Sequence, residues 1–201
     1  MDIRTILVIF HVVGTALGAG AATVSDYLFF HFAKDKKVER HEFRILQTVS
    51  DIVWAGLLIL VLSGFGFVLL YLSGHEAVNA SYNLDKIYAK TTIVIILLIN
   101  GFVLHRQVLP LFKKRLGKPF VTRSFIAKSP IVFTAGAISA ASWYTALVLG
   151  AWRGLTANYA EIMLCYVVVL CIGILISNIG GHAFLAQKPK KTKKRSRAAR
   201  S

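Results

Sequence analysis

Five long runs of apolar residues, almost free of charged side chains, constrain this chain more than any other feature of its sequence. A helix needs about 20 residues, roughly 17 to 25, to cross the hydrocarbon core of a bilayer. Inside the bilayer every backbone N–H and C=O must be bonded within the protein, which a helix achieves alone. The sequence therefore predicts an all-α, polytopic transmembrane bundle with five spans, at residues 6–32, 45–72, 87–104, 131–151 and 162–186.

The composition also indicates that lipid surrounds the helices. Of the 201 residues, 56% are hydrophobic, more than a water-soluble domain of this size needs for its core. The connecting segments are too short to build a second core. We therefore expect one transmembrane domain over residues 1–187, followed by a basic, disordered cytoplasmic tail over 188–201.

The basic residues predict the orientation of the bundle. Twenty of the 24 Lys and Arg residues lie between the first and second spans, between the third and fourth, or in the tail. Because positive charge gathers on the cytoplasmic side of a membrane protein, these three segments are expected there. Five spans then place the amino terminus outside and the carboxyl terminus in the cytoplasm. We expect the membrane to be a bacterial-type inner membrane.

The net charge of +15 raises the question of nucleic acid as a partner. The basic residues lie where membrane topology and anionic lipid already require them, and the tail has no interleaved aromatic residues. We therefore expect the lipid bilayer, and no nucleic acid, as the partner of these charges.

Small residues follow one face of the first span. His11, Gly14, Gly18, Ala22 and Ser25 recur at helical spacing, and small residues on one stripe let another backbone approach closely. This face is expected to point into the bundle, carrying His11 with it. Such faces also offer contacts for a homo-oligomer.

Ionisable groups inside a membrane cost about 2.5 to 3.5 kcal/mol each on insertion scales, so they mark candidate sites. His11 and Lys90 lie at similar depth near the predicted outer surface and form one candidate site. The alternative is that the Lys90 ammonium reaches the outer headgroups while His11 bonds to a neighbouring helix.

A second layer lies toward the cytoplasmic side. His105 and His182 fall at nearly the same depth, each expected about one turn before its helix ends. Two neutral imidazoles facing each other are what a six-coordinate b haem needs as axial ligands, and Gly180 and Gly181 would leave room for a flat macrocycle. The alternative is that both histidines face headgroups.

The same layer suggests ion transport. Asp26, late in the first span, has Asp51, Asn100 and Asn178 at similar depth, and a buried carboxyl beside a second acid can carry protons or bind a cation. Asp51 is expected at a helix start, where the helix dipole alone favours a carboxylate. Only Asp26 therefore demands a functional or pairing explanation.

Two prolines are expected to mark helix boundaries. Ser129 followed by Pro130 fits an N-cap and a first helical position for the fourth span. Pro110 is expected in the loop before it.

Over its first 105 residues the chain distantly resembles the HemJ-type membrane protoporphyrinogen oxidases, and in outline it is similar to the copper resistance D-like integral membrane proteins. The resemblance rests on His11 opening the first span, Leu28-Phe29-Phe30-His31 ending it, the Ser63-Gly64 step, and Lys90 opening the third span. It implies a bound b haem, with His11 and Lys90 in the positions associated with haem binding and activity. The family's Tyr-His-Gly in the third helix stands here as Asn100-Gly101.

Three functions follow as hypotheses. The first is a haem b protein of electron transfer or tetrapyrrole-linked redox chemistry, an oxidoreductase or a partner of one, working with a redox protein or quinone. The second is a small proton- or cation-linked transporter or channel that uses Asp26. The third is a membrane subunit or assembly factor without chemistry of its own.

Overall fold

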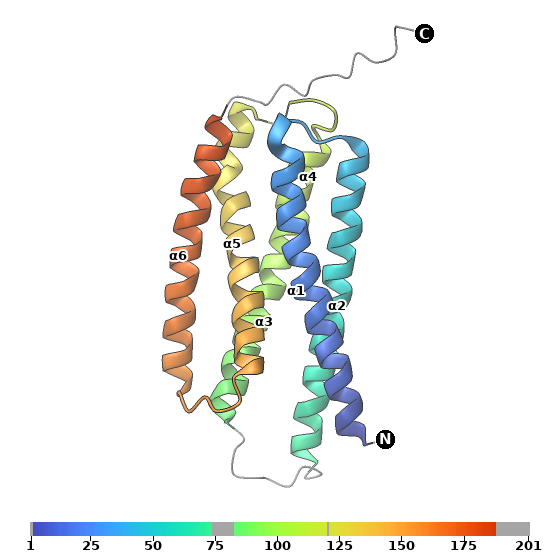
Figure 1. Cartoon of the computed structure of the whole chain (residues 1–201), viewed down its shortest axis with the longest axis vertical. Coiled ribbons are helices and arrows are strands. Elements are labelled where there is room, and N and C mark those ends of the chain that lie inside the picture. The colour runs from blue at the N-terminus through green and yellow to red at the C-terminus, as the bar shows by residue number, and fades with distance from the viewer. Residues whose placement is uncertain (1, 74–82, 120, 188–201) are drawn as a thin grey trace, which may run out of the picture.

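The chain folds into a bundle of long helices, described here from a computed structural model over residues 2–73, 83–119 and 121–187. The predicted tail, 188–201, lies outside the described residues. The helices, seen in Figure 1, are α1 (Ile3–Phe32), α2 (Arg40–Leu72), α3 (Leu84–Val103), α4 (Leu109–Lys113), α5 (Arg123–Ala151) and α6 (Tyr159–Ala186). Two short segments join them, a 3-10 helix η1 (Ala33–Asp35) and a π-helix η2 (Leu104–Val108).

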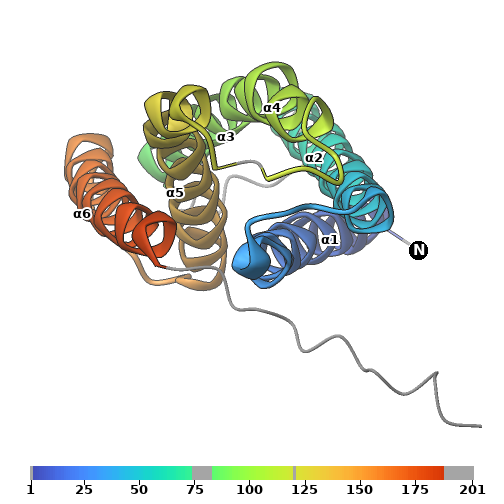
Figure 2. The same cartoon turned by 90° about the horizontal axis from the view of Figure 1, so that it is seen from above.

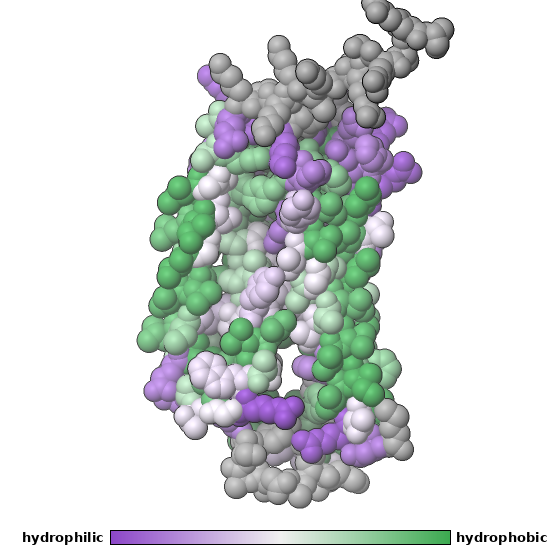
Figure 3. All heavy atoms as spheres, in the orientation of Figure 1, coloured by the Kyte–Doolittle hydropathy of each residue, from purple (hydrophilic) through white to green (hydrophobic). Residues whose placement is uncertain are grey.

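Five helical segments are long and apolar enough to cross a membrane, α3 being counted together with its continuation through η2 and α4. Apolar side chains cover the sides of the bundle and polar side chains gather at its two ends (Figure 3). This all-α fold confirms the predicted multi-pass membrane protein.

The helices reach further than predicted at one end of the bundle, which we call the basic end because it contains Lys34, Lys37, Lys113 and Lys118. There α2 begins at Arg40, α3 continues to Lys113 and α5 begins at Arg123. The start of α2 is fixed by a capping box, in which the Glu39 and Glu42 side chains accept each other's backbone N–H. The helices therefore extend as polar turns beyond the predicted apolar runs.

Both expectations for the prolines are wrong. Pro130 lies inside α5, seven residues after its start, and Pro110 lies in the first turn of α4. Proline has no N–H for the carbonyl four residues before it, which for Pro130 is that of Ile126. The Ser129 hydroxyl donates to the Ile126 oxygen at 2.8 Å, so Ser129 supplies the bond that Pro130 cannot make.

The closest packing joins α1 to α2 through glycine, as the small-residue face predicted. A Cβ on Gly14 would lie 2.8 Å from the Leu60 nitrogen, and one on Gly56 would lie 2.5 Å from the Gly18 nitrogen. Gly18 also faces the ring of Trp143 from α5, which is 1% exposed. Because α1 uses this face within the chain, the same face is not free for a homo-oligomer.

Viewed along the bundle, α1, α2, α3 with α4, and α5 follow one another around a ring, and α6 packs outside it against α5 (Figure 2). Polar bonds fix α6 in place: Ser177 Oγ donates to the Phe133 oxygen at 2.9 Å, and Ser142 and Tyr166 share a hydroxyl bond of 2.9 Å. This arrangement leaves space between α1 on one side and α5 and α6 on the other.

Candidate functional site

A large cavity of about 1210 Å³ lies mainly between α1, α5 and α6, and residues of α2, η2 and α4 add to its lining. Its lining is mainly apolar, with small residues of α5, among them Gly136, Ala137 and Ala140, along its floor. Val169 and Ile176 of α6 line the cavity and are 50% and 66% exposed, so the cavity opens onto the lipid-facing side of the bundle. An apolar molecule can therefore reach it from the bilayer.

Aromatic rings and a lysine close the large cavity at the basic end. Phe30 contacts Phe184 at 5.6 Å and Phe133 at 6.4 Å between ring centroids. Lys36, only 7% exposed, donates from Nζ to the Phe184 oxygen and lies 4.0 Å from the centroid of that ring. Burial lowers the pKa of the Lys36 ammonium. Lys36 thus joins the connection between α1 and α2 to the end of α6.

A small cavity of about 120 Å³ lies next to the large one, between α1, α2, α3 and α5. Its lining is richer in polar groups. Residues with oxygen-bearing side chains line it from four helices: Ser25 and Asp26 on α1, Ser50 on α2, Asn100 on α3 and Ser139 on α5. Trp143 also lines it, and the Trp143 Nε1–H is buried with no acceptor among the described residues.

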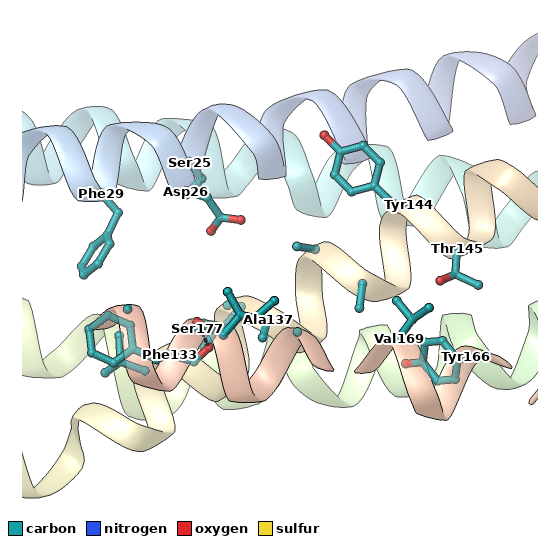
Figure 4. Close-up of a pocket in the computed structure, with 18 of the residues that line it drawn as sticks. Ser25, Asp26, Phe29, Phe133, Ala137, Tyr144, Thr145, Tyr166, Val169 and Ser177 are labelled. Carbon is teal, nitrogen blue, oxygen red and sulfur yellow. Dashed lines mark hydrogen bonds between the residues drawn. The ribbon is translucent and has the colours of Figure 1, made fainter. Parts of the chain in front are cut away.

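Asp26 lines both cavities, as do its neighbours Ser25 and Ser50. Figure 4 shows the Asp26 carboxylate projecting from α1 toward Ala137 of α5. The carboxylate makes no hydrogen bond or ion pair with any residue that the structure describes, although it is only partly exposed. The sequence predicted that Asp26 needs a functional or pairing explanation, and no pairing is present in the described part of the chain.

The π-helix η2 borders the small cavity through Leu104 and His105. It comes directly before Pro110, which has no N–H to continue the regular hydrogen-bond pattern. π-turns inside long helices occur frequently at functional sites. The irregular turn thus lies beside the group of polar residues.

The other polar residues of the predicted ion path have different positions. The Asn100 amide donates from Nδ2 to the Ala135 oxygen at 2.9 Å, and Asn178 donates to Thr134 Oγ1 at 3.0 Å and to the Ile174 oxygen at 2.9 Å. Asn100 lines the small cavity, but Asn178 lines neither and links α6 to α5.

The expectation that Asp51 lies at a helix start, where the helix dipole favours it, is wrong. Because α2 begins at Arg40, Asp51 lies eleven residues into the helix, about three turns from its start. The dipole at the helix start acts only over the first turn. Asp51 is exposed and lines neither cavity, so it does not accompany Asp26.

The predicted outer site of His11 and Lys90 stays a prediction, because no hydrogen bond joins these two side chains in the described part of the chain. His11 lies on α1 and Lys90 on α3, and His11 Nδ1 lies 3.0 Å from Ser63 Oγ of α2. Ser63 Oγ also lies within hydrogen-bond distance of the Ile59 oxygen, at 2.7 Å, and of the Leu60 oxygen, at 3.1 Å. Ser63 has one hydroxyl hydrogen for these three neighbours, so the tautomer of His11 decides whether His11 Nδ1 donates or accepts.

The predicted haem pair is not brought to one cavity. His105 is exposed on η2 and lines the small cavity, whereas His182 is exposed on α6 and lines neither. The large cavity, which alone of the two has the size for a macrocycle, has no histidine in its lining. The residues of these cavities therefore do not fit a haem held by His105 and His182.

Other metal chemistry has few candidate ligands here. Among residues 2–73, 83–119 and 121–187, no group of three or more His, Cys, Asp or Glu side chains could hold a metal ion. Oxygen from hydroxyl and amide groups is the chemistry that the small cavity offers instead.

Sequence reasoning missed Ser139 and Trp143 as parts of this site. Nothing in the sequence singles out Ser139, because serine is a common small residue at helix contacts. The one signal available was its place on the same helix face as Gly136.

No protein-family model, curated protein or solved structure matches this chain. The resemblance to the HemJ-type oxidases therefore stays a prediction. The function proposed for the protein therefore rests on the geometry of the two cavities.

Proposed function

We propose that this protein is a membrane transporter that exchanges a proton or another small cation for an amphipathic organic cation. The observation that carries the proposal is that Asp26 lines both cavities and has no partner among the described residues. In this function Asp26 is the group that both transported species use.

We infer exchange of the two cations, rather than their joint binding, because a single carboxylate is available to both. A charge buried in apolar surroundings is costly unless it is neutralised or paired. Asp26 can be neutralised by a proton, by a small cation from the small cavity or by an organic cation from the large one. Two positive species at one carboxylate would repel each other, so binding of one favours release of the other.

The large cavity suits the apolar part of the substrate. Phe29, Phe30 and Tyr144 line it near Asp26, and aromatic faces attract cations as well as apolar rings. Its opening beside Val169 and Ile176 gives access from the bilayer, where amphipathic cations concentrate.

The proposed orientation is the one that the basic residues favour. The amino terminus lies outside, and the basic end lies on the cytoplasmic side of the cell membrane. Asp26, six residues before α1 ends, then lies nearer the cytoplasmic surface. The cavity closure formed by Lys36 and Phe184 faces the cytoplasm.

Ethidium, a fluorescent aromatic cation, provides a direct test. We expect purified protein in liposomes to move ethidium when a proton gradient is imposed, and dissipating the gradient to stop the movement. Asp26→Asn keeps the shape of the side chain but cannot carry the charge, so we expect at least about a tenfold loss of rate.

Asp51→Asn is the matched control, because Asp51 is exposed and lines neither cavity. It should retain the rate of the unmodified protein. Gradient-driven movement that is equal in the Asp26→Asn variant, or absent from the folded unmodified protein, would exclude the proposed exchange.

Haem binding is a second candidate because of the geometry at His11. Ser63 Oγ lies 3.0 Å from His11 Nδ1, and a histidine held by a hydrogen bond at one ring nitrogen is common where the other nitrogen binds a metal. An ultraviolet-visible spectrum of the purified protein tests it. A Soret band lost in His11→Ala would support haem, and a colourless protein that resists reconstitution would contradict it.

A further inference from the structure

The serines of this chain divide into two groups. In membrane helices a serine hydroxyl commonly bonds to a backbone carbonyl of the preceding turn. Ser63, Ser129 and Ser142 do so, at 2.6 to 2.8 Å. Among the described serines, only three make no hydrogen bond to the described chain, and all three line the small cavity: Ser25, Ser50 and Ser139. Their hydroxyls remain available for an occupant of that cavity.

Two further oxygen donors complete the lining. The Asn100 side chain is 5% exposed and donates from Nδ2 to Ala135, which leaves its carbonyl oxygen free to accept or to ligate. The Asp26 carboxylate adds a negative charge. Five oxygen-bearing side chains from four helices therefore surround one small space.

We propose that the small cavity binds a monovalent alkali cation, ligated by Asp26, by the hydroxyls of Ser25, Ser50 and Ser139, and by the Asn100 carbonyl oxygen. The inference deepens the proposed transport function and rests on it for the cation's role as the species exchanged.

The charge of the site favours such an ion. A single carboxylate neutralises one positive charge, whereas Ca²⁺ sites draw on 6 to 8 oxygens, with carboxylates prominent among them. The small cavity, of about 120 Å³, has about a tenth of the volume of the large one, to which the organic cation is assigned.

The position of the site explains how cation binding in the small cavity can be coupled to substrate binding in the large one. Ser25 and Asp26 belong to α1, while Ser139 belongs to α5, and these two helices also form opposite sides of the large cavity. A cation held between them links the occupancy of the small cavity to the spacing of the walls around the substrate.

Sodium is the probe for the first measurement. We expect the melting temperature of the purified full chain in detergent to rise by at least about 3 °C when NaCl replaces choline chloride at equal ionic strength. Equilibrium binding of radioactive sodium should reach about one ion per chain. Asp26→Asn and Ser139→Ala should each weaken sodium binding at least tenfold.

Two serines of α2 supply a matched pair of variants if Ser139→Ala fails to fold. Ser50→Ala should lose the sodium response, whereas Ser63→Ala should keep it, because Ser63 lines neither cavity. Equal melting temperatures of the unmodified protein in sodium and choline, or a full sodium response in folded Ser50→Ala and Ser139→Ala, would overturn the site.

The two proposals fail separately. Sodium binding without ethidium exchange would leave the cation site intact and reject the transport function. Proton-driven ethidium exchange in a protein that binds no sodium would support the transport function and reject the alkali cation site.

Discussion

The contact between α1 and α2 depends on the absence of side chains at Gly14 and Gly56, and Gly18 leaves room for the Trp143 ring of α5. A methyl group on Gly14 or on Gly56 would lie within 3.0 Å of backbone atoms of the facing helix, which cannot move aside. Because the same helix α1 carries Asp26, the glycine contact also sets how far the carboxylate reaches toward α5.

Substituting Gly56 therefore tests the packing. We expect Gly56→Ala to lower the free energy of unfolding by about 1 to 3 kcal/mol, since overpacking forces the backbones apart. Thermal unfolding in detergent measures the change. Gly20→Ala is the control, because a Cβ on Gly20 meets nothing within 4 Å; equal losses in both variants would contradict the packing argument.

The residues of the site differ in how far the sequence could predict them. Asp26 stood out because a charge in an apolar run has few explanations. Ser139 did not, because whether a serine bonds to its own helix or faces a cavity depends on the neighbouring helices. Asp51 was misjudged because the polar start of α2 extends five residues before the predicted span.

At the scale of helices, apolar length predicted all five spans, while the polar turns at the basic end were missed. An apolar run marks the hydrocarbon core, but a helix continues into water wherever capping and side-chain bonds permit it. The two prolines show the limit most clearly, because local bonds keep Pro130 inside α5 and a π-turn precedes Pro110.

The role of Ser129 can be isolated by a double-mutant cycle. Ser129→Ala should cost about 1 kcal/mol of stability, because it leaves the Ile126 carbonyl without its side-chain donor. In a Pro130→Ala background the new backbone N–H can bond to that carbonyl, so the same change should cost much less. If Ser129→Ala lowers the stability equally in both backgrounds, as measured by thermal unfolding, Ser129 does not act by replacing the N–H that Pro130 lacks.

At the scale of the whole molecule, matching depths did not determine which residues meet. His105 and His182 were paired because both lie one turn before a helix end, but depth does not fix the direction in which a helix face points. The placement of α6 outside the ring, bonded to α5 through Ser177, decided the outcome.

The proposed orientation has a simple test in a variant without Cys165 and Cys171. Single cysteines at Lys37 and Lys118 should both react with a membrane-impermeant maleimide only after the cytoplasmic side is opened. A cysteine at Asn158, at the start of α6, should react in intact cells. Labelling of Lys37→Cys and Lys118→Cys from opposite sides would contradict the topology.

The central claim is that one carboxylate serves both cavities, and proton release measures it most directly. In weakly buffered, sodium-free detergent solution at about pH 5.5, ethidium binding should release protons, at most one per chain, from the unmodified protein and from Asp51→Asn, because the cation replaces the proton on Asp26. Asp26→Asn should release none. Equal proton release from Asp26→Asn, or ethidium binding to the unmodified protein without any release, would contradict the account.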